Sequence, residues 1–389
     1  MNPRGNGPTT DDVPIDASSR GHRATAIVWM VLLVAGLVVG LWSLKRVDLP
    51  PEKATHAAWM NGSAETAINQ SLRLPGQSWI EMASAAARYR LLGDLGEQVV
   101  LGCPQWMFYH DGLRAQPGTA SDVVSQRLRL LEHWHDRLQS RNIRTLVVAV
   151  PDKARVESEH LCGRKMSAAM QARYGELDKA LAARSIAFVD LRPVLEKQSD
   201  DMYFRTDVHM NAAGAQRAAQ AVASKALAVL GGQRGEQRFE VSAPTAAQAR
   251  MGDLIVLSGL KNAPAGWRPD IESEPQQTIT PVRSGGLLDD APPVRVLLAG
   301  SSNGLRSNFA EWLGHDLGQE VWNLSMDGGQ FSGAMVKAFA QAERWPASLQ
   351  LVIWEFSENT LSLPLTDDEK QALKQITTPL LADARNATE

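Results

Sequence analysis

The 389-residue chain is poor in cysteine and has no surplus of basic residues. Its formal net charge is −3 and no long run of like charge appears, so nothing in the composition indicates a nucleic-acid-binding protein. The two cysteines, Cys103 and Cys162, are too few and wrongly spaced for a structural zinc site, and we expect no metal. An even count allows one disulfide in an oxidising compartment, while two small buried thiols fit the sequence equally well.

Long apolar segments are scarce too, and only one stretch is suited to a membrane. Residues 24–44 carry no charge and are rich in valine and leucine, and a helix of that length spans the roughly 30 Å hydrocarbon core of a bilayer. Trp29 and Trp42 lie near its ends, where indole rings favour the headgroup region. The run exceeds the apolar core of a typical signal peptide, which favours a retained anchor, with a buried core helix as the alternative. Lysine and arginine are evenly divided between the two flanks, so the positive-inside rule does not orient the span.

The composition on either side of this span predicts the domain organisation. Residues 1–23 are rich in small and polar side chains and are expected to form a disordered cytoplasmic tail. Residues 45–90 are expected to form a linker with one or two helices. Residues 91–389 are expected to form one domain, interrupted at about 233–292 by an irregular insertion rich in Gln, Pro, Gly and Ser.

Within that domain, apolar strands alternate with segments of helical composition. The expected strands lie at 97–101, 145–150, 186–191, 294–299, 320–324 and 349–356. The expected helices lie at 121–139, 167–184, 211–230, 306–317 and 333–344. This alternation predicts an α/β fold with a doubly wound, mostly parallel sheet and helices on both of its faces.

Two separate segments supply the side chains of an acyl-transfer triad. Ser302 follows the apolar run 296–299 and Gly300, at the strand end where parallel sheets bind their ligands. Asp207 and His209 are two residues apart, which places both side chains on one side of an extended segment. A serine hydroxyl needs a neighbouring base, and that base needs an orienting acceptor. Simpler interpretations also fit: a helix cap at Ser301 or Ser302, and a solvated pair or half of a metal site at Asp207 and His209.

Five motifs in order resemble the AlgJ/AlgX family of bacterial polysaccharide O-acetyltransferases, whose catalytic domain is SGNH-hydrolase-like. The motifs are Pro151-Asp152-Lys153-Ala154-Arg155, Tyr203-Phe204-Arg205-Thr206-Asp207-Val208-His209, Gly300-Ser301-Ser302, Asn323 with Gly328-Gly329, and Val352-Ile353-Trp354-Glu355-Phe356. The resemblance covers about residues 90–360 and is closer to AlgJ, because too few residues follow the last strand for a C-terminal carbohydrate-binding module. The order Asp, His, Ser is permuted relative to simple GDSL-type hydrolases and is the order of the resembling family.

The resemblance implies roles for particular residues. It implies a nucleophile at Ser302, a base at His209 and an orienting carboxylate at Asp207. It also implies an oxyanion role for Asn323, Gly328 and Gly329. Tyr203 and Arg205 are candidates for substrate contact on other grounds: they flank the Asp207–His209 pair, and a guanidinium is suited to hold a carboxylate on a sugar acid or within the protein. Each has a plainer alternative: a structural salt bridge for the arginine and an ordinary turn for the asparagine and glycines. Glu355, at the end of the last strand, is a candidate to support the site from behind. No cofactor is expected.

The expected protein is a single-pass inner-membrane O-acetyltransferase with its catalytic domain in the periplasm. It would acetylate an exopolysaccharide of biofilms, such as alginate, through an acetyl-serine intermediate. The resemblance implies three kinds of partner: the polysaccharide acceptor, a multi-spanning membrane acyltransferase that delivers acetyl, and other proteins of an exopolysaccharide complex. Two alternatives remain open at this point: a polysaccharide acetyl-esterase that uses the same triad, and a non-catalytic scaffold of a secretion complex.

Overall fold

The structure is a computed structural model that describes residues 16–72, 75–116, 119, 122–196, 198–283 and 293–386. It divides into two compact units, Met1–Glu81 and Met82–Glu389. Most of the tail expected at 1–23, and residues 284–292 of the expected insertion, lie outside the described residues.

The first unit is dominated by one long apolar helix, α1 (Asp16–Leu44). Within it, His22–Leu44 has a mean hydropathy of 2.5 and is the one helix in the described part of the chain that is long and apolar enough to cross a membrane. Its length and composition fit a single-pass anchor. Short helices follow it: η1 (Pro51–Lys53), α2 (His56–Met60) and α3 (Ser63–Ser71).

The second unit is built on a five-stranded parallel sheet with the strand order β10-β9-β11-β3-β4. The strands are β3 (Arg144–Val150), β4 (Ala187–Val189), β9 (Val296–Ala299), β10 (Val321–Asn323) and β11 (Leu351–Ser357). The central ones are almost wholly buried and mostly apolar, as expected for parallel strands covered on both faces. The predicted doubly wound α/β fold is therefore confirmed. The strand expected at 97–101 forms β1 (Val99–Leu101), which pairs with β2 (Met107–Tyr109) outside this sheet.

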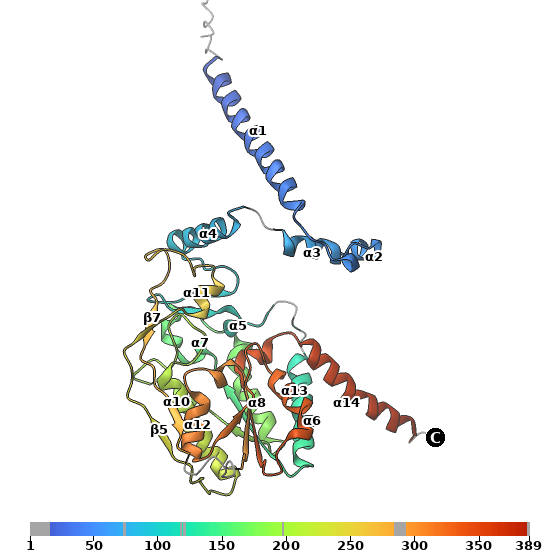
Figure 1. Ribbon diagram of the computed structural model, residues 1–389, viewed down its shortest axis with the longest axis vertical. Helices are drawn as coiled ribbons and strands as arrows, with labels where there is room; N and C mark the ends of the chain where they lie inside the picture. The colour runs from blue at the N-terminus through green and yellow to red at the C-terminus, as the bar shows by residue number, and fades with distance from the viewer. Residues whose placement is uncertain are drawn as a thin grey trace, which may run out of the picture. The chain divides into compact units, whose positions relative to one another are not determined.

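Helices cover both faces of the sheet (Figure 1). Alternate residues of β3 point to opposite sides: Leu146 and Val148 join one core cluster, and Val147 and Ala149 join the other. The first face is covered by α10 (Ala212–Val229) and α12 (Phe309–Leu317). The second is covered by α6 (Val123–Gln139), α8 (Ala168–Ala182) and α13 (Gly333–Ala340). The last helix, α14 (Asp367–Asn386), is tied to α6 by a fully buried ion pair, Arg127–Glu369, at 2.9 Å.

The expected insertion is partly ordered and contains two short antiparallel strand pairs. These are β5 (Phe239–Val241) with β8 (Ile279–Pro281), and β6 (Gln248–Arg250) with β7 (Glu272–Glu274). Between β6 and β7 lies a short helix, α11 (Asp253–Leu257). It buries Leu254 and Ile255 in a third core cluster with Ala85 and Ala86 of α4 (Gln77–Leu92). The remaining short elements are α5 (His110–Leu113), α7 (Lys153–Val156), η2 (Ser158–Leu161), α9 (Arg192–Leu195), η3 (Ser302–Leu305), η4 (Ala342–Arg344) and η5 (Glu358–Ser362).

Cys103 and Cys162 form a disulfide, with their Cα atoms 5.6 Å apart. The bond joins the β1–β2 turn to the residue that follows η2, across a sequence separation of 59 residues. Closing a loop of this length lowers the entropy of the unfolded chain by an amount worth about 4 kcal/mol. Of the two alternatives that the sequence left open, the structure therefore has the bridge.

Candidate active site

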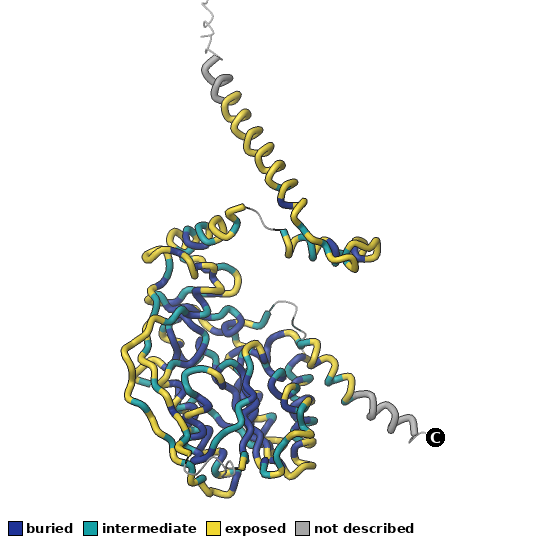
Figure 2. Tube along the Cα trace, viewed as in Figure 1, coloured by how far each residue is buried: buried dark blue, intermediate teal, exposed yellow. Residues whose placement is uncertain are grey.

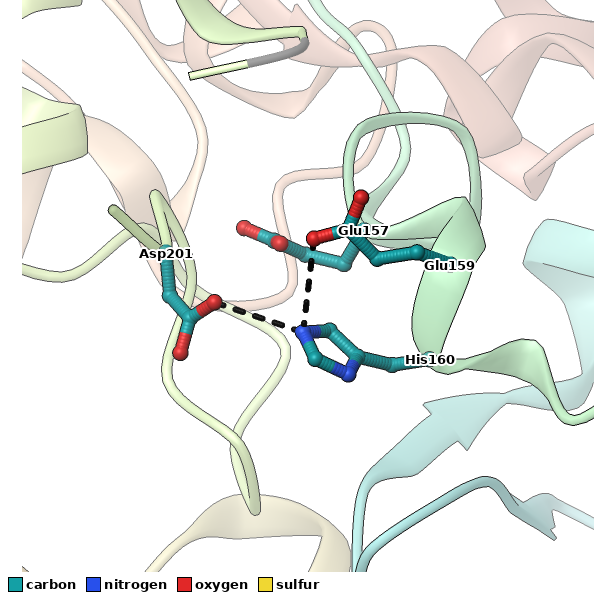
Figure 3. A group of neighbouring side chains, drawn as sticks. All are labelled: Glu157, Glu159, His160 and Asp201. Carbon is teal, nitrogen blue, oxygen red and sulfur yellow. Dashed lines mark hydrogen bonds and ion pairs between the residues drawn. The ribbon is translucent and has the colours of Figure 1, made fainter. Parts of the chain in front are cut away.

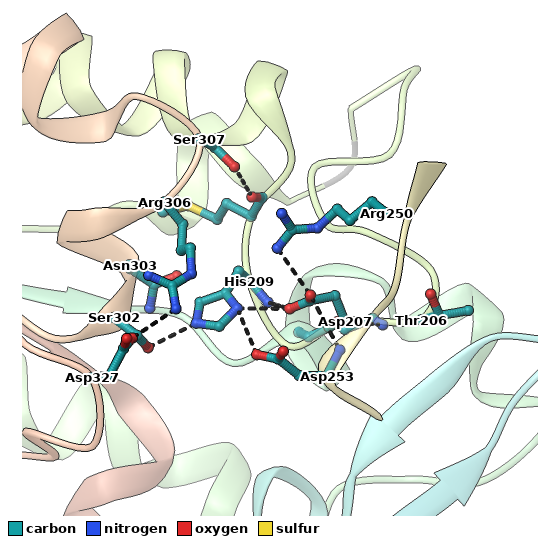
Figure 4. Close-up of polar contacts among 12 residues, drawn as sticks. Thr206, Asp207, His209, Arg250, Asp253, Ser302, Asn303, Arg306, Ser307 and Asp327 are labelled. Atoms are coloured by element: carbon teal, nitrogen blue, oxygen red, sulfur yellow. Dashed lines mark hydrogen bonds and ion pairs between the residues drawn. The ribbon is translucent and has the colours of Figure 1, made fainter. Parts of the chain in front are cut away.

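The structure brings the predicted serine, histidine and aspartate together at the carboxyl end of the sheet. Ser302 begins η3 directly after β9, and its Oγ lies 2.7 Å from Nε2 of His209. The other ring nitrogen, Nδ1, lies 2.6 Å from Oδ1 of Asp207. Figure 4 shows the imidazole between the hydroxyl and the carboxylate. The aspartate and histidine are almost completely buried, so their interaction is shielded from solvent.

The loop that carries Asp207 and His209 is held by buried polar groups. The carboxylate of Glu272, in β7, accepts hydrogen bonds from the backbone N–H groups of Arg205 and Thr206 at 2.7 Å each. At its far end, Asn211 caps α10 by accepting from the N–H of Gly214. The two side chains are therefore positioned by contacts on both sides of the loop.

Lys153 fixes the same loop from beneath. Its buried Nζ donates to the backbone carbonyls of Met107, Arg205 and Asp207 at 2.6, 2.8 and 3.0 Å. Burial lowers the pKa of Lys153 to about 7. The three carbonyl acceptors oppose that shift, because a neutral amine has only two N–H bonds to donate. The lysine expected in this motif therefore serves as a brace for the triad loop.

Two residues of the insertion complete the surroundings of Asp207. Its Oδ2 accepts from Nη2 of Arg250 at 2.9 Å and from the backbone N–H of Asp253 at 3.3 Å. Burial alone would raise the pKa of Asp207, but the hydrogen bond and charge of His209, together with the Arg250 guanidinium, outweigh it. They hold the pKa of this carboxyl well below its usual range, so Asp207 is ionised at neutral pH.

Asp253 also faces the imidazole. Its Oδ2 lies 3.4 Å from Nδ1 of His209, and its side chain is half exposed at the pocket. Burial, followed by the neighbouring charge of Asp207, raises the pKa of Asp253. Neither Asp253 nor Arg250 was singled out from the sequence. They lie in an irregular segment without periodicity, and no local pattern marks them.

The turn before Ser302 is anchored to the last strand of the sheet. The carboxylate of Glu355 accepts from the N–H of Ser301 at 2.6 Å and from its hydroxyl at 2.8 Å. Burial raises the pKa of Glu355 to about 7. Space around the turn is tight, since a Cβ added at Gly304 would lie 2.2 Å from Oγ of Ser325. Glu355 thus supports the position of Ser302 through Ser301 without touching it.

Not all of the remaining predicted residues line the pocket. Gly328 and Gly329 line the pocket, and Gly328 has a φ of +68° that favours glycine. The amide of Asn323 instead braces the turn, donating to the carbonyl of Gly304 at 2.8 Å and accepting from the N–H of Ser325 at 2.9 Å. Its contacts therefore give no support to an oxyanion role for the side chain.

Tyr203 and Arg205 also differ in position. Tyr203 is buried at the base of the pocket, and its hydroxyl donates to the carbonyl of Pro151. Arg205 lies outside the pocket and donates through Nη2 to the carbonyl of Asp270 at 2.9 Å. Of the two residues expected to contact substrate, only the tyrosine borders the cavity.

The cavity at the triad has a volume of about 410 Å³. Ser302, His209 and Asp253 form one part of its wall, while Val256 and Leu257 of α11 form an apolar side. A cavity of this size can hold a sugar ring or an acyl group.

A second group of titratable residues, drawn in Figure 3, is not part of the lining of this cavity. It contains Glu157, Glu159, His160 and Asp201, with Nε2 of His160 3.3 Å from Oδ1 of Asp201. The carboxylate of Glu157 accepts from the backbone N–H groups of Met202 and Tyr203 at 2.7 and 3.0 Å. These two hydrogen bonds satisfy the buried carboxylate of Glu157. The carboxylate thereby helps to hold the loop that carries Asp207 and His209.

Comparisons with known proteins agree on one family. Residues 99–358 match the family model described as "SGNH hydrolase-like domain, acetyltransferase AlgX". The "Probable alginate O-acetylase AlgJ" of Pseudomonas putida is 28% identical over 342 residues, which cover 85% of each chain. The "Alginate biosynthesis protein AlgX" of Pseudomonas fluorescens is 26% identical over 260 residues, or 61% of this chain and 52% of that protein.

Solved structures show the same relationship. The O-acetyltransferase domain of Pseudomonas putida AlgJ superposes with a TM-score of 0.59 and 26% identity, covering 71% of this chain and 99% of that one. Pseudomonas aeruginosa AlgX superposes with a TM-score of 0.52 and 23% identity, covering 67% and 62%. The second similarity is one of fold.

Proposed function

The chain belongs to the AlgX family of SGNH hydrolase-like acetyltransferases, and on this premise we propose that Ser302, His209 and Asp207 are the catalytic triad with which it acetylates alginate or a similar exopolysaccharide. It is an O-acyltransferase by family. The observation that carries the residue assignment is the pair of short contacts at the imidazole, 2.7 Å to the hydroxyl and 2.6 Å to the carboxylate.

In the first half-reaction, Ser302 takes the acetyl group from the donor. Oγ attacks the donor carbonyl while Nε2 of His209 accepts its proton, and the imidazolium then protonates the leaving group as the carbonyl–leaving-group bond breaks. The ionised Asp207 keeps the hydrogen of the ring on Nδ1 and stabilises the imidazolium. The product is an acetyl ester on Ser302.

In the second half-reaction, a sugar hydroxyl takes the acetyl group. His209 accepts the proton of that hydroxyl as its oxygen attacks the acetyl carbonyl, and then returns a proton to Oγ of Ser302 as the ester bond breaks. The oxyanion of both steps is assigned to the backbone N–H groups of Ser302 and Gly328. Both residues line the cavity, and neither N–H has a hydrogen-bond acceptor in the described part of the chain.

The proposed setting is the periplasmic face of the inner membrane. The apolar helix α1 fits a single anchor, and the disulfide between Cys103 and Cys162 suits an oxidising compartment. Acetyl groups activated in the cytoplasm must then be passed across the membrane, so the proposed donor is a multi-spanning membrane acyltransferase. The curated relatives are named for alginate, which supports a uronic-acid polymer as acceptor and other proteins of its export complex as further partners.

Activity of the purified full chain on a small acetyl ester, with and without an oligouronate acceptor, tests this function. The proposal expects acetylated oligosaccharide, and expects Ser302→Ala and His209→Ala to abolish it. Ser348→Ala is the matched control, because that hydroxyl donates to the carbonyl of Val294 away from the cavity. Ester hydrolysis without any transfer would favour an esterase. Full polymer acetylation in cells that carry only Ser302→Ala would favour a scaffold.

A further inference from the structure

We propose that the end of the catalytic unit formed by α4, α11 and the loop after α11 lies against the surface of the bilayer that α1 spans. The triad cavity would then open beside the lipid headgroups. The membrane contact does not depend on the proposed function, whereas its consequence for acetyl delivery rests on that function.

Exposed hydrophobic side chains gather at this end of the catalytic unit. Among the described residues from 82 to 376, eight large hydrophobic side chains are exposed. Five of them belong to α4, α11 and the loop after α11: Leu91, Leu92, Val256, Leu257 and Trp267. Leu91 and Leu92 are 74% and 75% exposed, among the highest values for any leucine described in the chain. We call these five residues the apolar end.

The segments of the apolar end pack on one another. Ala85 and Ala86 of α4 share the third core cluster with Leu254 of α11 and Ala263 of the following loop. Figure 1 shows α4 and α11 next to each other at one end of the unit, and Figure 2 shows that many residues of α4 are exposed. The five exposed side chains are therefore carried by one packed substructure.

Helix α4 carries an apolar side chain on its exposed face. Ala85 is buried in the core, whereas Leu91 lies on the same exposed face as Ser84, seven residues and about two turns earlier. A surface helix of a soluble domain normally has polar side chains along the whole of that face. Arg88 and Arg90 flank it, as cations flank the apolar face of helices that lie in a membrane interface.

The apolar end reaches the cavity. Val256 and Leu257 are both 45% exposed and also line the cavity that contains Ser302 and His209. A membrane in contact with α4 and α11 would therefore lie at the mouth of the triad cavity. Acetyl handed over by a membrane-embedded donor would enter there without crossing open solvent.

The covalent link to α1 is the reason to assign the occupant as lipid. Only 32 residues separate the end of α1 at Leu44 from the start of α4 at Gln77, and even fully extended they reach about 110 Å. The catalytic unit therefore stays near the bilayer, and the link through α1 gives the lipid a high effective concentration at its surface. Because of this, even an apolar surface too small to bind a free partner is in contact with lipid for much of the time.

Quenching by lipid-borne nitroxides tests the contact in the full chain. The protein is reconstituted in phosphatidylethanolamine–phosphatidylglycerol vesicles that contain nitroxide-labelled lipid, with a fluorophore on Leu91→Cys or, as the control position, on Val241→Cys. Val241 is exposed in β5, outside the apolar end, and the described chain has no free thiol to compete for the label. The proposal expects quenching at 91 to be several-fold stronger than at 241. Equal quenching at the two positions would overturn it, as would quenching at 91 that appears only when a partner membrane protein is added.

A charge variant supplies the second measurement. The double change Leu91→Glu and Leu92→Glu should abolish quenching of a fluorophore placed at Trp267→Cys, whereas the matched pair Val241→Glu and Val282→Glu should not. Both leucines are exposed and lie outside the cavity, so hydrolysis of a soluble acetyl ester should be unchanged. Unaltered quenching in the leucine variant would contradict the proposal. Failure of the proposed function would give a different result from failure of the membrane contact. Ester turnover that survives Ser302→Ala would contradict the catalytic assignment, whereas the quenching measurements test the membrane contact alone.

Discussion

Replacing Arg250 by methionine should weaken catalysis through Asp207 without removing any group that touches substrate. The guanidinium donates to Oδ2 of Asp207 at 2.9 Å, while Oδ1 accepts from Nδ1 of His209 at 2.6 Å. Methionine keeps much of the side-chain volume against the ring of Phe204, over which Arg250 lies at 4.3 Å. The variant therefore removes the charge and the hydrogen bond and leaves the packing in place.

The magnitude follows from the exposure of the pair. A hydrogen bond between charged groups contributes about 1.5–3 kcal/mol, and the arginine side chain is 26% exposed, so solvent screening places it near the lower end. A loss of about 1–2 kcal/mol in the orientation of Asp207 corresponds to a fall in kcat/KM of about 5- to 30-fold. The remaining anchor of Oδ2, the N–H of Asp253 at 3.3 Å, is too long to compensate.

The assay is kcat/KM for an acetyl ester measured across pH. Without the cation, Asp207 pairs with the imidazolium alone, so the acid limb of the profile should move to higher pH, by up to about one unit. Arg250→Lys should restore the acid limb but only part of the rate, because an ammonium does not match the geometry of the guanidinium. Arg268→Met, in the same insertion but bonded to the carbonyl of Ala263, is the control. An Arg250→Met enzyme with an unchanged rate and unchanged acid limb would refute this reasoning.

Three further predictions concern the support of the site and the fold. Burial raises the pKa of Glu355 to about 7, above its usual 4.5, so its contribution to stability is fully present below pH 4.5 and is lost as pH rises through 7. Glu355→Gln should flatten this part of the stability–pH curve, by up to about 3 kcal/mol in chemical denaturation. An unaltered slope would show that Glu355 is not the source of this pH dependence. Gly304→Ala would place its Cβ 2.2 Å from Oγ of Ser325 in a buried turn. The displaced turn should lower ester turnover by about 10- to 100-fold, and the overlap should also lower the free energy of unfolding by about 1–3 kcal/mol. Arg127→Met leaves the Glu369 carboxylate buried without its cation; urea denaturation should show a loss of about 3–5 kcal/mol, and a loss below 1 kcal/mol would show that the pair is dispensable.

The central sheet was predictable because its strands are buried on both faces. Segments 146–150 and 296–299 are continuous apolar runs between helical segments, and such runs have few other stable arrangements in an α/β domain. The grouping of Ser302, His209 and Asp207 was predictable for a related reason. Asp207 and His209 are neighbours in sequence, and Ser302 directly follows a buried strand, so each half of the site is encoded locally.

What the sequence did not predict depends on side-chain direction and on distant contacts. Arg250 and Asp253 lie 43 and 46 residues beyond Asp207, and only the folding of the insertion brings them to it. Asn323 was placed at the correct strand end, but its amide turns toward Gly304. Position along a strand determines which edge a residue occupies, whereas the local packing determines where its side chain points.

The most direct test of the catalytic assignment is the mass of the intact protein after brief incubation with an activated acetyl ester. The account predicts one added acetyl group, located on Ser302 by peptide mapping and removed when an oligouronate acceptor is supplied. In Asp207→Asn the hydroxyl remains, but the imidazole is held in the wrong tautomer, so labelling should be slower by orders of magnitude. Stoichiometric labelling of the Ser302→Ala protein, or of a different residue in the native chain, would contradict the account.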